Sequence, residues 1–160
     1  MATPLTKVYE AFLAKITSDE WFNSGSDEDV QHDWRMILEA ALFRFKFPRV
    51  SLEIETIEET DEDDDTIITI IEQFVEDLGR AEIQLLSWYM KHEWVKRCIA
   101  DWYEIKSLYT DKDFSQANHL SAMVKYDNQL VIDCAKAEGI YDRSRDGRPY
   151  DYGRLAGKRG

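Results

Sequence analysis

The feature that most constrains the fold is an uninterrupted helical pattern that starts after Gly79. From Arg80 to about Tyr109 neither proline nor glycine interrupts the run of thirty residues. At about 1.5 Å per residue such a helix is about 45 Å long, which exceeds a typical globular helix. A bend or a separate element near Ser107 is therefore an alternative to one straight helix. The apolar residues that predict its buried face are Ile83, Leu86, Tyr89, Val95, Cys98, Ile99 and Trp102.

The tryptophans of this segment point in different directions. Helical rotation places Trp88 and Trp102 near the same face, whereas Trp94 points elsewhere. Aromatic residues on several sides indicate a helix that is covered on several sides. It is either the central helix of a bundle or a helix that also packs on a neighbouring subunit.

Three further segments carry an apolar stripe at helical spacing. In the first, Thr3–Pro4 supplies a capping residue and a proline suited to the first helical position. In the second, Ser26 and Asp29 resemble a capping box. The third starts near Asp113, and Gly139 is expected to end it. The stripes are Leu5, Val8, Tyr9, Phe12, Leu13 and Ile16; Val30, Trp34, Ile37, Leu38, Ala41, Leu42 and Phe45; and Leu120, Met123, Val124, Val131 and Cys134.

Between the helix that contains Val30 to Phe45 and the long helix that starts at Arg80, the period of the apolar residues changes to that of a strand. In "VSLEIETI" the apolar residues Val50, Leu52 and Ile54 alternate with polar ones, and "TIITII" is β-branched throughout. The intervening "EETDEDDD" has seven carboxylates in eight residues. We therefore predict a mainly α protein: a bundle of about four helices with a β-hairpin inserted at about 49–76, whose tip is acidic.

Charge divides the chain into a body and a tail. The net charge is −12, but 143–160 has six basic residues against two aspartates, +4, which leaves −16 on 1–142. We predict one helical domain over 1–142 and an extended basic arm over 143–160. The length suits a single core, and no apolar run approaches the roughly 20 residues that span a bilayer. The N-terminal stretch "MATPLTKVYEAF" also lacks the charged-then-apolar pattern of a signal peptide. We therefore expect a protein that stays in the compartment where it is made.

The acidic stretch also has part of the spacing of a calcium-binding EF-hand loop. Asp61, Asp63, Asp65 and Glu72 occupy ligand positions, but Thr66 stands where the loop needs glycine. The preceding segment alternates like a strand, whereas an EF-hand is flanked by helices. We favour a solvated tip, with loose binding of divalent ions or a partner contact as alternatives, and we expect no cofactor.

Signatures of catalysis are missing from the sequence. His32, His92 and His119 have no second ligand at tight metal-binding spacing, and there is neither a glycine-rich phosphate loop nor a G-x-S-x-G elbow. We predict that the protein is not an enzyme and has no catalytic or metal-binding residues.

Four stretches together resemble a family of known proteins. They are "TPLTKVYEAFLAKI", "FKFPRVSL", "EDLGRAEIQLLSWYMKHEWVKR" and "IKSLYTDKDFSQANHL", and they cover most of 2–125. The chain resembles head–tail connector (adaptor) proteins of tailed bacteriophages, with Asp113–Leu120 the most distinctive piece. The resemblance implies a homo-oligomeric ring, usually dodecameric, below the portal protein of the virion. The ring is then expected to extend the DNA channel and to form a platform for the next neck or tail protein. No membrane partner is expected.

Two groups of residues become candidate contact sites within that interpretation. The acidic tip is expected at or near the channel, where it repels DNA phosphates, and a tip that points outward into solvent is the alternative. The arm is expected to contact the portal or a neighbouring subunit. The tip residues are Glu58, Glu59, Asp61, Glu62, Asp63, Asp64 and Asp65, and the arm residues are Arg143, Arg145, Arg148, Tyr150, Tyr152, Arg154, Lys158 and Arg159.

The strongest rival function is an acidic regulatory protein that mimics DNA and blocks a host nucleic-acid enzyme. The net charge of −12 favours it. A mimic needs carboxylates spread along a surface, however, and here they cluster in one loop, with a basic tail at the end of the chain.

Overall fold

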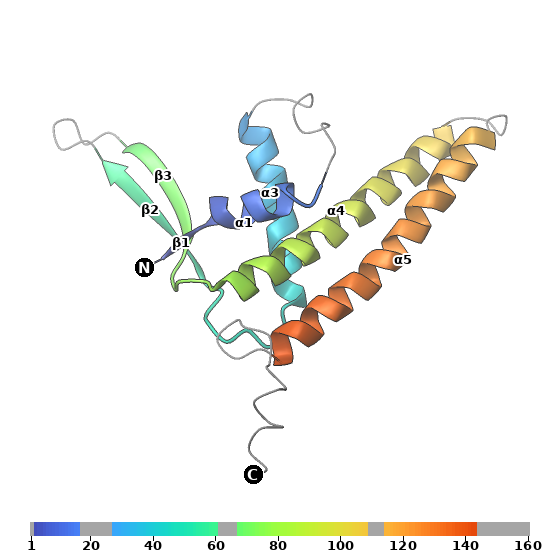
Figure 1. The fold of residues 1–160 in the computed structure, drawn as a ribbon. Helices are drawn as coiled ribbons and strands as arrows, with labels where there is room; N and C mark the ends of the chain where they lie inside the picture. Colours follow the sequence, from blue (N-terminus) through green and yellow to red (C-terminus); the bar gives the residue numbers. More distant parts are fainter. Residues whose placement is uncertain (1, 17–26, 61–66, 109–113, 144–160) are drawn as a thin grey trace, which may run out of the picture.

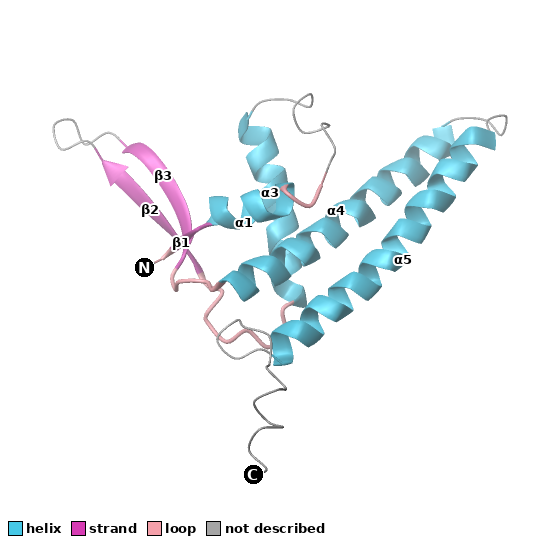
Figure 2. Cartoon of the chain, in the orientation of Figure 1, coloured by secondary structure: helices cyan, strands magenta, loops and turns pink. Residues whose placement is uncertain are grey.

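The computed structural model describes residues 2–16, 27–60, 67–108 and 114–143. Within these residues the chain forms four helices and three strands (Figure 1). In chain order they are β1 (Thr3–Pro4), α1 (Leu5–Leu13), α3 (Asp27–Arg44), β2 (Ile54–Thr60), β3 (Ile67–Phe74), α4 (Arg80–Leu108) and α5 (Phe114–Arg143). The predicted class is confirmed: the protein is mainly helical, and a β-hairpin lies between α3 and α4 (Figure 2).

Helix α4 is the centre of the fold. Helices α1, α3 and α5 all pack against it, and α5 runs back alongside it (Figure 1). Because it is covered on several sides, its buried residues point in several directions: Leu86, Met90 and His92 are all at most 4% exposed. Trp88 and Trp94 are half-buried and pack against the same core. The chain therefore uses α4 as a central helix, and α4 continues as a single element to Leu108.

The apolar stripes predicted for the first two helices form the rest of the core. Val8 and Phe12 of α1 are 0% exposed, as are Leu38 and Ala41 of α3. These small and large side chains pack with α4 in one continuous cluster. The predicted capping box of α3 begins at Ser26, which lies outside the described residues.

The sheet is antiparallel in the order β1-β3-β2. The end of the sheet that lies next to the helices is buried in the core. Phe74 at this end is 0% exposed and pairs with Ile54 on β2 and Thr3 on β1. Strand β2 begins at Ile54, later than the alternation suggested. Val50 and Leu52 lie before it and are half-buried against the core, which is why the alternation extends past the strand.

The start of the first helix differs from the prediction. Thr3 does not cap α1; its hydroxyl donates to Asp77 Oδ1 at 2.9 Å and accepts from the Leu78 N–H at 2.8 Å. Pro4 has extended backbone angles, φ −65° and ψ 145°, and the helix begins at Leu5. Thr3 is 1% exposed. Its hydroxyl therefore satisfies the buried N–H of Leu78, which follows β3, and not an N–H of α1.

Helix α5 corrects two further predictions. Gly139 does not end it; the helix continues to Arg143. Val131 is 50% exposed and Val124 is 37% exposed, whereas Leu130 is 1% exposed. The reason is that α5 packs mainly on α4, so its buried seam is narrow and follows a spacing of three and four residues. The described seam residues are Leu120, Leu130, Cys134, Ala137 and Tyr141.

Candidate binding surface

The structure describes only part of the acidic tip. Glu58 is exposed on β2, and Glu59 belongs to the same strand. Asp61, Glu62, Asp63, Asp64 and Asp65 lie outside the described residues. The tip connects β2 to β3, so its flanks are strands and not the helices of an EF-hand. Glu72, the twelfth position of that loop pattern, accepts from Arg35 Nε of α3 at 3.3 Å.

The first residue of the predicted arm belongs to helix α5. Arg143 is the last residue of α5, and its Nε donates to the Gly139 carbonyl oxygen at 2.8 Å. The remaining arm residues, Arg145, Arg148, Tyr150, Tyr152, Arg154, Lys158 and Arg159, lie outside the described residues. In Figure 1 the outer end of the hairpin and the C-terminal end of α5 lie far apart, so the two predicted groups start from different ends of the molecule.

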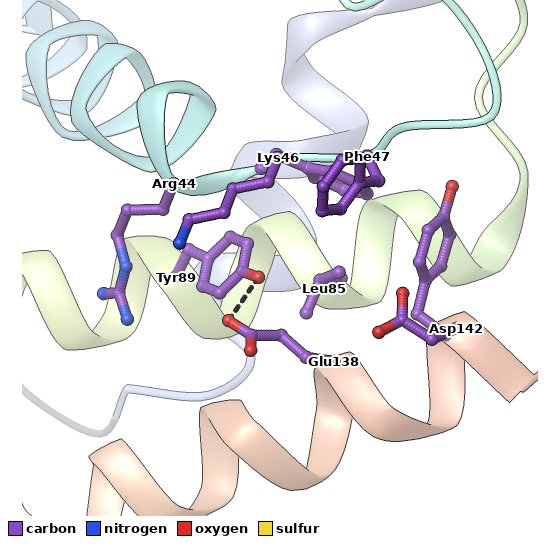
Figure 3. Close-up of a pocket in the computed structure, with 9 residues that line it drawn as sticks. Arg44, Lys46, Phe47, Leu85, Tyr89, Glu138 and Asp142 are labelled. Atoms are coloured by element: carbon purple, nitrogen blue, oxygen red, sulfur yellow. Dashed lines mark hydrogen bonds between the residues drawn. The ribbon is translucent and has the colours of Figure 1, made fainter.

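A cleft of about 170 Å³ opens where the C-terminal end of α3 meets α4 and α5. Figure 3 shows Lys46 and Arg44 on one side and Glu138 on the other, with Tyr89 between them. The Tyr89 hydroxyl donates to Glu138 Oε1 at 2.6 Å. Burial, and then the Glu138 carboxylate, raise the pKa of Tyr89 well above its ordinary value, so this hydroxyl stays protonated. Apolar walls come from Phe45, Phe47 and Leu85.

A polar network beside the cleft joins α3, α4 and α5. Arg44 Nη1 donates to His92 Nδ1 at 2.8 Å and to Glu93 Oε1 at 3.2 Å. Arginine has no acceptor, so the imidazole is neutral with its proton on Nε2, which donates to Asp127 Oδ1 at 2.9 Å. Burial, and then the Arg44 charge, lower the pKa of His92. The network holds Arg44 over the Tyr89 ring, 4.8 Å from its centroid.

A second network fixes the chain after α3 to the end of α5. The Tyr141 hydroxyl accepts from the Arg49 N–H at 2.9 Å and donates to Glu82 Oε1 at 3.1 Å. The Arg49 guanidinium also donates to the Tyr141 carbonyl oxygen and lies 4.4 Å from the ring centroid. Burial is the main reason why the pKa of Tyr141 is raised. Residues 45–49 are therefore held in place by contacts with α5.

Two phenylalanines, one on the last turn of α3 and one in the segment 45–49, project into solvent. Phe43 is 91% exposed and Phe47 is 80% exposed, and Lys46 between them is also exposed. We call Phe43, Lys46 and Phe47 the aromatic–basic patch. The sequence pattern did not predict this patch, because only Phe45 of "FRFKF" fits the stripe of α3. The available signal was that Phe43 and Phe47 fall off that stripe yet flank basic residues.

The side chains at this surface offer both charged and apolar contacts to a partner. Lys46 and Arg44 can attract a carboxylate, while the two phenylalanines offer apolar contact area. Over residues 2–16, 27–60, 67–108 and 114–143, no three His, Cys, Asp or Glu side chains gather closely enough to hold a metal ion. In that same part of the chain, every helix is too short or too polar to cross a membrane.

Comparison with known proteins identifies no relative. No family model matches the chain, and neither a curated protein nor a solved structure matches it. The fold and surface therefore define a mainly helical protein with a small antiparallel sheet and an exposed aromatic–basic patch.

Proposed function

We propose that this chain is a structural protein of a bacteriophage virion, a head–tail connector whose copies assemble into a ring below the portal. The ring, expected to be dodecameric, would extend the DNA channel and join the head to the next neck or tail protein. DNA would pass through without sequence-specific binding.

The observation that carries this proposal is the distribution of exposed apolar side chains. They occur on separate elements: Phe43 and Phe47 at the end of α3, Ile70 on β3, and Val131 and Ile132 on α5. Exposed apolar residues that occur close together, as Phe43 with Phe47 and Val131 with Ile132 do in the chain, are typical of contact surfaces. A ring subunit needs two different surfaces, one for each neighbour, plus further surface for the proteins above and below.

The charge distribution supports the same proposal. Glu55 and Glu58 of β2 are exposed, and the sequence places seven carboxylates in eight residues at the outer end of this hairpin. A hairpin this acidic repels phosphates, which suits the wall of a channel through which DNA slides. The basic residues that follow Arg143 would instead contact an acidic surface of the portal or of a neighbouring copy.

The composition of purified virions tests the proposal. A connector is present in every particle at a fixed ratio to the portal protein, measured by quantitative mass spectrometry, and class averages of the neck show its ring. A DNA mimic, which the charge of −12 also suits, is made in infected cells but absent from particles. Its absence from virions would therefore reject the connector.

Deletion of residues 144–160 tests the arm separately. The described core ends at Tyr141, so the shortened chain should keep its helical circular dichroism and cooperative unfolding. We expect it to lose attachment to portal-bearing heads in a sedimentation assay. Normal attachment of a folded, truncated protein would contradict a role of the arm in docking.

A further inference from the structure

One face of the hairpin is buried against the core at its base and exposed toward its outer end. Phe74 on this face is 0% exposed, and two residues along the strand Glu72 is still tied to the body by Arg35. Two residues further, Ile70 is 62% exposed. Side chains alternate along a strand, so all three point to the same side of the sheet. The body covers the base of this face and leaves its outer part open.

The residue opposite Ile70 is acidic. The register pairs Ile70 directly with Glu58 of β2, whose side chain is also exposed. Cross-strand partners have neighbouring side chains, so an isoleucine and a carboxylate form one small surface. We call Glu58 and Ile70 the hairpin patch.

The aromatic–basic patch has the opposite character. Phe47 and Lys46 are chain neighbours, and Phe43 lies on the last turn of α3. In Figure 3 the Lys46 side chain extends toward Arg44 and Tyr89, and the Phe47 ring lies on the other side of the Lys46 backbone. Lys46 is suited by its charge to meet Glu58, and the rings are suited to cover Ile70. Within one molecule the two patches do not cover each other, because Phe43, Phe47 and Ile70 are 91%, 80% and 62% exposed.

We propose that the aromatic–basic patch of one copy binds the hairpin patch of the next copy. This rests on the proposed function, since it names the contact by which neighbouring subunits join. The two patches are different surfaces, so the contact is heterologous and runs head to tail. Such contacts close into a ring when the rotation per subunit allows it, and a two-fold dimer does not satisfy them.

Two variants that each remove one patch test this contact. Phe43→Ser with Phe47→Ser removes the aromatic anchors, and Glu58→Lys with Ile70→Ser removes the hairpin patch. All four side chains are exposed, so circular dichroism and thermal unfolding should match the wild type. Loss of a buried aromatic anchor weakens association roughly 30-fold or more. We expect each variant alone to be monomeric by light scattering over a concentration series in which the wild type assembles.

Mixing the two variants is the decisive measurement. Each retains the patch that the other lacks, so the mixture should give a one-to-one complex and no larger species. Ile140→Ser, on α5 and 56% exposed, is the matched control outside both patches and should assemble like the wild type. A chain that carries Lys46→Glu together with Glu58→Lys should associate more tightly than either single reversal.

The outcomes separate this contact from the connector function. If the wild type assembles and both patch variants assemble equally well, the contact is wrong and the connector remains. Monomeric variants that form no complex when mixed would also overturn it, because the patches then do not meet each other. A wild type that stays monomeric at every concentration would contradict both the contact and the ring.

Discussion

Replacement of Leu130 by alanine tests the seam between α4 and α5. Leu130 is 1% exposed, and its truncation leaves a cavity against α4. Buried Leu→Ala substitutions lower the free energy of unfolding by about 2–5 kcal/mol, depending on how far the site collapses. Because α5 packs mainly on α4 and can move toward it, we expect the lower part of that range, about 2–3 kcal/mol. For a chain of this size, that lowers Tm by about 4–12 °C.

Val131→Ala is the matched control. Val131 is the next residue along the chain and is 50% exposed, so its truncation should change the free energy of unfolding by less than about 0.5 kcal/mol. Urea unfolding followed by circular dichroism measures both variants. The protein concentration should be varied, because self-association adds to apparent stability. If Val131→Ala destabilises the chain more than Leu130→Ala, the register of this seam is wrong.

Three further predictions concern the polar networks and the end of α5. Burial and Arg44 lower the pKa of folded His92 below 6.5, so the unfolded chain binds more protons below that pH and stability falls with acidification. His92→Gln keeps a donor and an acceptor without titrating. The decrease in the free energy of unfolding in urea between about pH 7.5 and about pH 5.5 should therefore be smaller in this variant. An equal decrease in the variant and the wild type would exclude His92 as the cause. Tyr141→Phe leaves the Arg49 N–H and Glu82, which is 5% exposed, without this hydroxyl, and should lower the free energy of unfolding by about 1–3 kcal/mol. Tyr126→Phe, at a residue 46% exposed, is its control, and equal effects of the two would contradict the network. Gly139→Ala should raise the free energy of unfolding by about 0.5–1 kcal/mol, because the residue is inside a helix and its new Cβ would lie 3.1 Å from Arg143 Nη2, the end of an exposed side chain that can shift. A Tm lowered by this substitution would instead indicate a helix end at Gly139.

Local patterns predicted the helices and the hairpin well. The stripes of α1 and α3 form the core as expected, and the β-branched run after the acidic stretch forms β3. These predictions succeed because periodicity in sequence reports which side of an element is buried. They fail where burial depends on how many neighbours an element has. Because α5 packs mainly on α4, Val124 and Val131 lie outside its buried seam.

The binding surface was harder to predict than the fold. Phe43 and Phe47 carry no periodic signal, and aromatic residues are usually assigned to the core. Phe43 is on the solvent-facing side of α3, and Phe47 is exposed because the contacts of Arg49 with Tyr141 hold the segment after α3 along the surface. Arg49 and Tyr141 lie ninety-two residues apart in the chain, so neither sequence neighbourhood reveals the contact.

The sequence by itself determined the mainly helical class, the inserted hairpin, the acidic body and the basic end of the chain. These follow from composition and from local periodicity, which the chain carries at every residue. Only the tertiary structure decided that Thr3 bonds to residues after β3, that Gly139 lies within α5, and that one face of the hairpin leaves the core at Ile70. Each of these depends on which distant segment lies alongside, because burial and hydrogen bonding are set by neighbours in space.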